Sequence, residues 1–130
     1  MESKFQFKSP YLVQMDYKTN EDFERAEETF DIAIPCKLNN EVAMSEDGLA
    51  AKVTLTISVG SDECPFVANV SMESEFEWEP DTFSEETVKD LLQNNASALL
   101  LSYARPIIAN ITNASKYPAF NIPFIDLTKN

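Results

Sequence analysis

The chain has 130 residues, of which 44% are hydrophobic and 11% aromatic, and its formal net charge is −12. This length fits a single domain over residues 1–130, and the apolar content excludes a disordered chain. The excess of 22 acids over 10 bases excludes a nucleic-acid binder, which needs a basic face. No run approaches the roughly 20 apolar residues of a membrane span, and no secretory signal pattern opens the sequence. We therefore expect a cytoplasmic protein with no membrane insertion.

The first part of the chain, roughly residues 4–78, alternates apolar and polar residues, which predicts β-strands. The alternation covers 5–17, 30–38, 49–59 and 66–78. Acids, lysines and hydroxyls occupy the opposite phase, so these segments predict a four-stranded antiparallel sheet with one solvated face. Pro10 predicts a bend or bulge on an edge. In the segment 11–17 the alternation predicts one apolar face, made of Tyr11, Val13, Met15 and Tyr17.

After Pro80 the apolar spacing becomes helical, which predicts helices over roughly 85–116. Ser84 is the expected N-cap. The polar stretch 93–95 predicts a division into a short and a long helix. Pro106 lacks the amide of a mid-helix hydrogen bond and predicts a kink around 102–105. An extended apolar tail, 117–130, follows, and the whole is an α+β fold with its helices packed on one face of the sheet.

The residue types needed for most catalysis are missing from the sequence. There is no histidine, and there are only two cysteines and two glycines. These counts argue against a nucleophile–base pair, a structural zinc site and a phosphate-cradling loop. We therefore expect no enzyme, no metal site and no cofactor. Arg105 lies in the most apolar helix, where we expect it to cap backbone carbonyls or to pair with a carboxylate across an interface.

Surface is the remaining candidate for function. Residues 96–111 are apolar around most of the predicted helix, so one sheet face cannot cover them and a second subunit is expected. The predicted interface consists of Leu99, Leu100, Tyr103, Arg105, Ile107, Ile108 and Ile111.

Several aromatic side chains suit a groove for extended apolar polypeptide, or else they only complete the core. The predicted groove consists of Trp78, Tyr103, Tyr117, Phe120 and Phe124.

Three stretches resemble the export chaperone SecB. The helix sequence LLSYAR (100–105) resembles the family's Leu-Phe-Pro-Tyr-Ala-Arg motif. The sequence KYPAFNI (116–122) resembles its Gly-x-Phe-Pro exit, and FQFKSPYL (5–12) resembles its first strand. The order of four strands and a long helix also agrees. The resemblance spans roughly residues 5–127 and identifies a short, divergent SecB-like chain without the family's C-terminal helix.

The resemblance implies a four-stranded sheet, a dimer or dimer of dimers packed through the long helices, and ATP-independent binding of unfolded polypeptide, linked to protein export. Two positions in the helix depart from the family motif: Ser102 replaces its proline, and a proline stands at Pro106. The acidic positions that dock the SecA ATPase correspond to Gln14, Lys18 and Asn69, with Val67 kept in type. None of the three is acidic, so the resemblance does not carry SecA over as a partner.

Two hypotheses therefore stand. The first is a SecB-like holdase for unfolded chains. The second is an interaction module of the same fold, serving one partner such as an antitoxin, or a scaffold, with no transfer to SecA.

Overall fold

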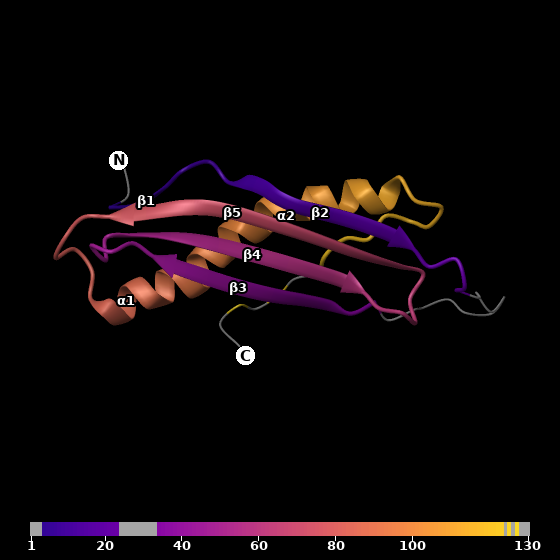
Figure 1. Ribbon diagram of the computed structural model, residues 1–130, viewed down its shortest axis with the longest axis horizontal. Helices are drawn as coiled ribbons and strands as arrows, with labels where there is room; N and C mark the ends of the chain where they lie inside the picture. Colours follow the sequence, from indigo (N-terminus) through magenta and orange to yellow (C-terminus); the bar gives the residue numbers. More distant parts are fainter. Residues whose placement is uncertain (1–3, 24–33, 124, 126, 128–130) are drawn as a thin grey trace.

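The computed structural model describes residues 4–23, 34–123, 125 and 127. One antiparallel sheet carries the helices on one face, which is the expected α+β fold (Figure 1). The strands are β1 (Phe5–Phe7), β2 (Tyr11–Thr19), β3 (Cys36–Met44), β4 (Ala50–Gly60) and β5 (Phe66–Trp78). The helical segment consists of α1 (Glu85–Asp90), the π-helical turn η1 (Leu91–Asn95) and α2 (Ala96–Asn113).

The sheet has five strands where four were expected, because its first edge is broken. β1 pairs with the end of β5, from Phe76 to Trp78, and β2 pairs with the same side of β5 from Phe66 to Glu73. Pro10 lies between the two pieces, as predicted, and divides one edge strand into two. β5 and β4 form the centre of the sheet, and β3 forms the other edge.

The alternation predicted for the two central strands is confirmed. Val53, Ile57 and Val70 are fully buried beneath the helices, while Glu73 and Glu75 point to the outer face. Burying each such apolar side chain contributes roughly 1.5–3 kcal/mol, so these strands supply most of the core. Both cysteines, Cys36 and Cys64, are free thiols, and burial raises the pKa of Cys36.

The face expected for the segment 11–17 is wrong at Tyr11. The register shifts between Leu12 and Gln14, so that Val13 is an extra residue. A bulge of one residue reverses the phase of everything before it. Tyr11 therefore lies opposite Glu73 on the outer face, while Met15 keeps the inner phase opposite Val70. The Tyr11 hydroxyl donates to Glu73, and this bond raises the pKa of Tyr11 to about 12.

The helical segment begins as predicted, since the Ser84 hydroxyl accepts a hydrogen bond from the Thr87 amide. The predicted division near 93–95 into a short and a long helix is confirmed: the π-helical turn η1 separates α1 from α2. α2 also continues through Pro106 and ends at Asn113. The kink around 102–105 stays a prediction.

After α2 the chain turns back toward the β3 side of the sheet (Figure 1). The Phe120 amide donates to the Thr112 hydroxyl at 2.7 Å, and Ile122 is only 4% exposed. The Arg105 guanidinium donates to the carbonyl of Ile122, and to that of Pro123 at 3.0 Å. This confirms the first expectation for Arg105, the capping of backbone carbonyls. Phe30 and Ile32, in the strand expected over 30–38, and Phe124 lie outside the described residues.

Candidate functional site

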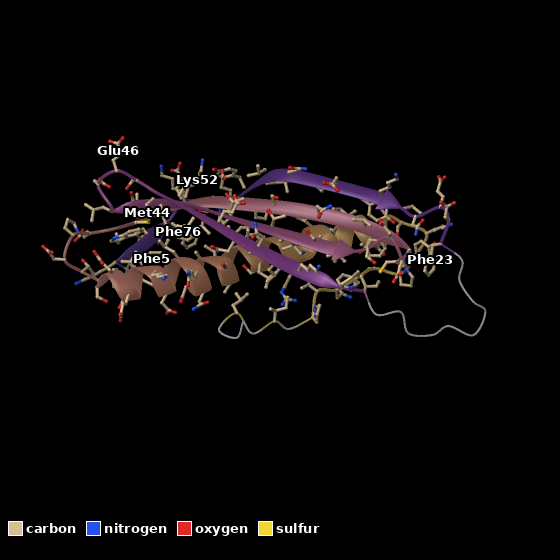
Figure 2. All side chains as sticks on the ribbon, turned by 60° about the horizontal axis from the view of Figure 1, so that its bottom comes forward. Phe5, Phe23, Met44, Glu46, Lys52 and Phe76 are labelled. Atoms are coloured by element: carbon tan, nitrogen blue, oxygen red, sulfur yellow. The ribbon has the colours of Figure 1, made fainter. Side chains whose placement is uncertain are left out.

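Three of the residues predicted to form one groove, Trp78, Tyr117 and Phe120, do not lie together but are divided between the two ends of the sheet. The Trp78 ring stacks on Phe5, with centroids 5.7 Å apart. Phe120 packs against Phe66 at the other end of the 13-residue strand β5, roughly 40 Å away. Tyr117 lies near Phe23 at that same far end. Figure 2 shows the separation, with Phe5 and Phe76 at one end and Phe23 at the other.

An apolar hollow of about 580 Å³ lies at the end of the sheet that carries Trp78, between the strands and the segment α1–η1. Of the predicted groove residues that the structure describes, only Trp78 lines it. Trp78 is 8% exposed and is held by Phe5, which also meets Phe83 edge to face at 6.4 Å. These rings form a preformed aromatic floor. The apolar lining consists of Val42, Met44, Leu49, Trp78, Phe83, Val88 and Leu92.

The hollow is open along the edge strand β3. The Asn40 side chain donates to the Ser97 hydroxyl, and more weakly to the Leu92 carbonyl at 3.4 Å, which ties β3 to the helical segment. After Asn40 the side chains on the inner face of β3 are no longer covered by the helical segment. Val42 is 38% exposed and Met44 is 51% exposed. Two apolar side chains thus overhang the hollow from a free strand edge. Leu38, Val42 and Met44 lie in the same phase of the strand, and this alternation could have extended the strand predicted over 30–38. The polar Asn40 lies between them in the same phase and interrupts the apolar pattern.

The rim of the hollow is mainly acidic. Among the described residues, Glu79, Asp81 and Glu85 line it together with one cation, Lys89. Because carboxylates repel acidic groups and attract basic ones, this rim favours ligands that are apolar with neutral or basic flanks.

A second group of exposed apolar side chains lies on the broken edge of the sheet and on α2. Phe7, Leu12, Val13 and Met15 of β1 and β2 are 45–52% exposed, and Tyr103 of α2 is 43% exposed. Single exposed apolar residues are common, but a run of four along one edge is typical of an interaction surface.

The residues of the predicted interface divide between core and surface. Leu100 and Ile108 are fully buried against the sheet, so they belong to the core of this chain. Leu99 and Ile107 are half-buried and share a flank of α2 with the exposed Tyr103, because residues four apart lie on one side of a helix. The Arg105 guanidinium is bonded to a backbone carbonyl of the segment that follows α2, and Ile111 is half-buried against the core.

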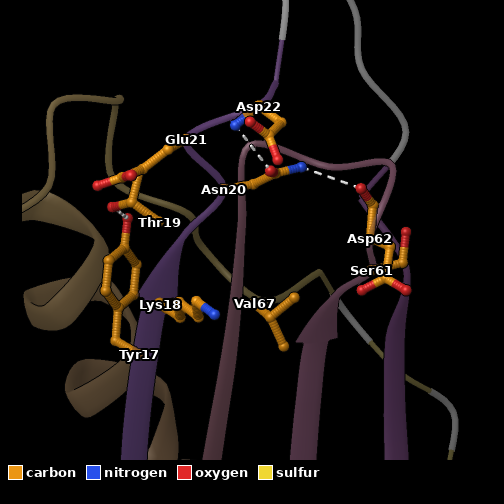
Figure 3. Close-up of a pocket in the computed structure, with 9 residues that line it drawn as sticks. All are labelled: Tyr17, Lys18, Thr19, Asn20, Glu21, Asp22, Ser61, Asp62 and Val67. Atoms are coloured by element: carbon orange, nitrogen blue, oxygen red, sulfur yellow. Dashed lines mark hydrogen bonds between the residues drawn. The ribbon is translucent and has the colours of Figure 1, made fainter.

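A larger cleft, of about 880 Å³, lies on the outer face at the far end of β2 (Figure 3). Lys18 and Val67, two of the positions compared with the SecA-docking surface, line it. Its walls are tied by Asn20, whose side-chain amide donates to the Asp62 and Cys64 carbonyls at 2.9 and 3.0 Å. These bonds brace the turn between β4 and β5.

The same face carries an acid that the sequence comparison missed. Asn69 donates to Asp16 at 2.9 Å, and Gln14 is bonded to the other oxygen of the same carboxylate at 3.4 Å. Asp16 therefore accepts one hydrogen bond on each carboxylate oxygen, and it adds one acid to the face where Gln14 and Asn69 are neutral. Farther along, hydrogen bonds from Tyr11 and Thr54 hold the pKa of Glu73 below its usual value.

Within the described residues no cluster of three or more histidine, cysteine, aspartate or glutamate side chains could hold a metal ion. In the same part of the chain, no helix has the length and apolarity needed to cross a membrane.

No protein-family model and no curated protein sequence matches this chain. Among solved structures, the Mycobacterium tuberculosis SecB-like chaperone Rv1957, in complex with a ChAD peptide from the Rv1956 HigA1 antitoxin, matches with a TM-score of 0.74 at 11% identity. The match covers 93% of this chain and 90% of that one. A protein of unknown function from Streptococcus agalactiae matches with a TM-score of 0.50 at 18% identity, over 92% and 97% of the two chains. The chain therefore has a SecB-like fold.

Proposed function

We propose that this chain is an ATP-independent chaperone that holds unfolded polypeptide by extended apolar segments. The observation that carries the proposal is the hollow floored by Trp78 and overhung by Val42 and Met44 on a free strand edge. The SecB-like fold supports it, since the similar Mycobacterium tuberculosis chaperone is described in complex with a peptide. Neither a nucleotide loop nor a metal cluster is needed for such binding.

The size of the hollow fits weak and unselective binding. A volume of about 580 Å³ accommodates two or three large apolar side chains. Burying that many side chains contributes roughly 4–8 kcal/mol, most of which is offset by the cost of immobilising a flexible segment. Because about 8 kcal/mol corresponds to a Kd of about 1 μM, a single site binds more weakly than this once that cost is subtracted, and tight holding requires several sites on one client. A holdase that must release its clients without ATP needs this range of affinity.

Repetition of the site would come from assembly. We propose a homo-oligomer, a dimer or a dimer of dimers, with Leu99, Tyr103 and Ile107 of α2 in its interface. Tyr103→Asp would place a charge in that apolar seam and lower the mass measured by light scattering. An unchanged mass, in a variant that keeps its circular dichroism spectrum, would remove α2 from the interface. A cytoplasmic location and an absence of enzymatic activity accompany this proposal.

The second candidate is a chaperone for one partner, such as an antitoxin. It is favoured by the antitoxin peptide in complex with the structurally similar chaperone. It is also favoured by the lack of an acid at Gln14, Lys18 and Asn69, the positions compared with the SecA-docking surface. Co-purification separates the two candidates, because a holdase recovers many polypeptides and a dedicated chaperone recovers one.

Aggregation of a denatured model protein tests the holdase directly. We expect stoichiometric amounts of this chain to slow the aggregation, and Val42→Asp to abolish the effect by placing a charge over the hollow. Ala43→Asp is the matched control, because Ala43 is on the same strand, points to the outer face and lies opposite Lys52. If Val42→Asp and Ala43→Asp lose the suppression of aggregation equally, or if the unmodified chain does not slow aggregation, the proposal is contradicted.

A further inference from the structure

The edge strand β3 is regular along its whole length. Its nine residues pair with β4 without a register shift, from Cys36 opposite Val59 to Met44 opposite Ala51. Pro35 precedes the strand, but no proline or bulge interrupts it. Among the described residues β3 pairs with β4 alone, so its other side is a free edge.

The opposite edge of the sheet is built differently. It is divided at Pro10 and carries a bulge at Val13, two devices that keep other chains from adding to a sheet. β3 has neither device. A straight, regular edge with unused hydrogen-bonding groups is a template for another strand. The molecule thus protects one edge and leaves the other open.

Two hydrogen bonds at the ends of β3 define which of its backbone groups are free. The Ser45 amide donates to the Ala50 carbonyl, and the Gly60 amide donates to the Pro35 carbonyl. In an antiparallel ladder the bonded pairs recur at every second residue, so the odd-numbered residues of β3 bond to β4. The amides and carbonyls of Asn40, Val42 and Met44 therefore point to the free edge. The side chains of Val42 and Met44 lie in the phase that faces the hollow.

We propose that the bound segment adds to β3 as a further antiparallel strand, opposite Asn40–Met44. Its main chain pairs with the free amides and carbonyls of Asn40, Val42 and Met44, and its alternate side chains lie over the hollow beside Trp78. This inference rests on the proposed function and states how that function recognises its client. Main-chain bonds are common to all sequences, whereas the hollow selects for apolar residues at every second position.

The occupant is an extended apolar segment of another polypeptide, with neutral or basic flanks. Charge separates it from the other candidate, a second copy of this chain. A second copy carries a net charge of −12 and would bring its own acidic rim toward Glu79, Asp81 and Glu85. An apolar segment between lysines has no such repulsion.

Backbone methylation tests the added strand. The probe is the peptide Lys-Thr-Val-Thr-Phe-Thr-Val-Thr-Lys, whose binding is followed through the fluorescence of Trp78, the single tryptophan of the chain. In an antiparallel added strand, the residues that face the hollow also point their amides at β3. N-methylation of the valines and the phenylalanine should therefore weaken binding, by roughly three- to tenfold for each lost bond. N-methylation of the threonines leaves the affinity within twofold and is the matched control.

The pattern of loss decides the inference. A loss of affinity confined to methylation of the valine and phenylalanine amides supports the inference. A loss confined to methylation of the threonine amides would mean a parallel strand and would overturn the antiparallel pairing. If the affinity of the peptide does not change on methylation, or falls equally for both sets of amides, the inference is overturned while the proposed function stays intact. If the unmethylated peptide and denatured proteins all fail to bind, the proposed function itself fails.

A substitution in the protein gives an independent test. Val42→Pro removes an amide that points to the free edge and breaks no bond to β4. Val42→Ala removes the side chain and keeps the amide, so the difference between the two variants isolates the backbone group. We expect Val42→Pro to bind the peptide at least threefold more weakly than Val42→Ala, with an unchanged mass by light scattering. Equal affinities, or a lower mass that assigns the edge to a second copy, would overturn the inference.

Discussion

The clamp that Arg105 makes on the tail gives a prediction with a calculable size. Arg105→Met keeps most of the apolar stem and removes the donors to the Ile122 and Pro123 carbonyls. A hydrogen bond to a charged group contributes about 1.5–3 kcal/mol. Because Arg105 is half-buried, we take the lower end for each bond, which gives about 3 kcal/mol for the pair. That free energy corresponds to roughly a 100-fold increase in the population with a detached tail.

The Phe120 amide reports this opening, because it donates to Thr112 only while the tail is docked. We expect its hydrogen exchange to accelerate by one to two orders of magnitude in Arg105→Met, while exchange in β4 changes far less. Arg105→Lys is the control, since one ammonium can reach one carbonyl and should give about a tenfold effect. Exchange of the Phe120 amide within twofold of the unmodified chain would refute the clamp. Equal acceleration in β4 would show that the substitution acts on global stability instead.

Three further predictions follow from the core and the outer face. Leu100→Ala should lower the free energy of unfolding by about 2–5 kcal/mol in chemical denaturation, because Leu100 is fully buried. One of the four tyrosines should titrate at about pH 12 in ultraviolet absorbance, and Tyr11→Phe should remove that component. Because the folded pKa of Tyr11 lies above its ordinary value of 10.0, the stability from its bond to Glu73 is fully present below about pH 10 and is lost as the pH rises toward 12. Glu73 has a lowered pKa, so its contribution is present at neutral pH and disappears in an acid titration as the pH falls through that lowered value.

The central strands and the start of the helix could be predicted from the sequence because their signals are local. The period of two in β4 and β5 follows from one buried and one solvated face, and Ser84 caps α1 through a bond to Thr87, three residues away. The face of Tyr11 could not be predicted. Its position depends on one bulged residue, Val13, and a period of two contains no mark of an insertion.

The candidate site was the harder part, because it depends on where an element loses its cover. Asn40 is a polar residue on the inner face of β3. The apolar alternation in the sequence therefore stops at Leu38, although the strand continues to Met44. The Asn40 bond to Ser97 joins residues 57 positions apart, and only the fold shows it. Trp78 was selected for the groove by residue type, and the structure places it with Val42 and Met44 instead of with Phe120.

Binding of unfolded polypeptide in the hollow is the central claim, and Trp78 is the direct reporter of it. The measurement is a titration of the chain with reduced and carbamidomethylated ribonuclease A, a permanently unfolded protein without tryptophan. We predict a saturable change in Trp78 emission, which is absent in Val42→Asp, retained in Ala43→Asp, and not produced by native ribonuclease A. An emission spectrum that stays constant through the titration, or that changes equally with the native protein, would contradict the claim.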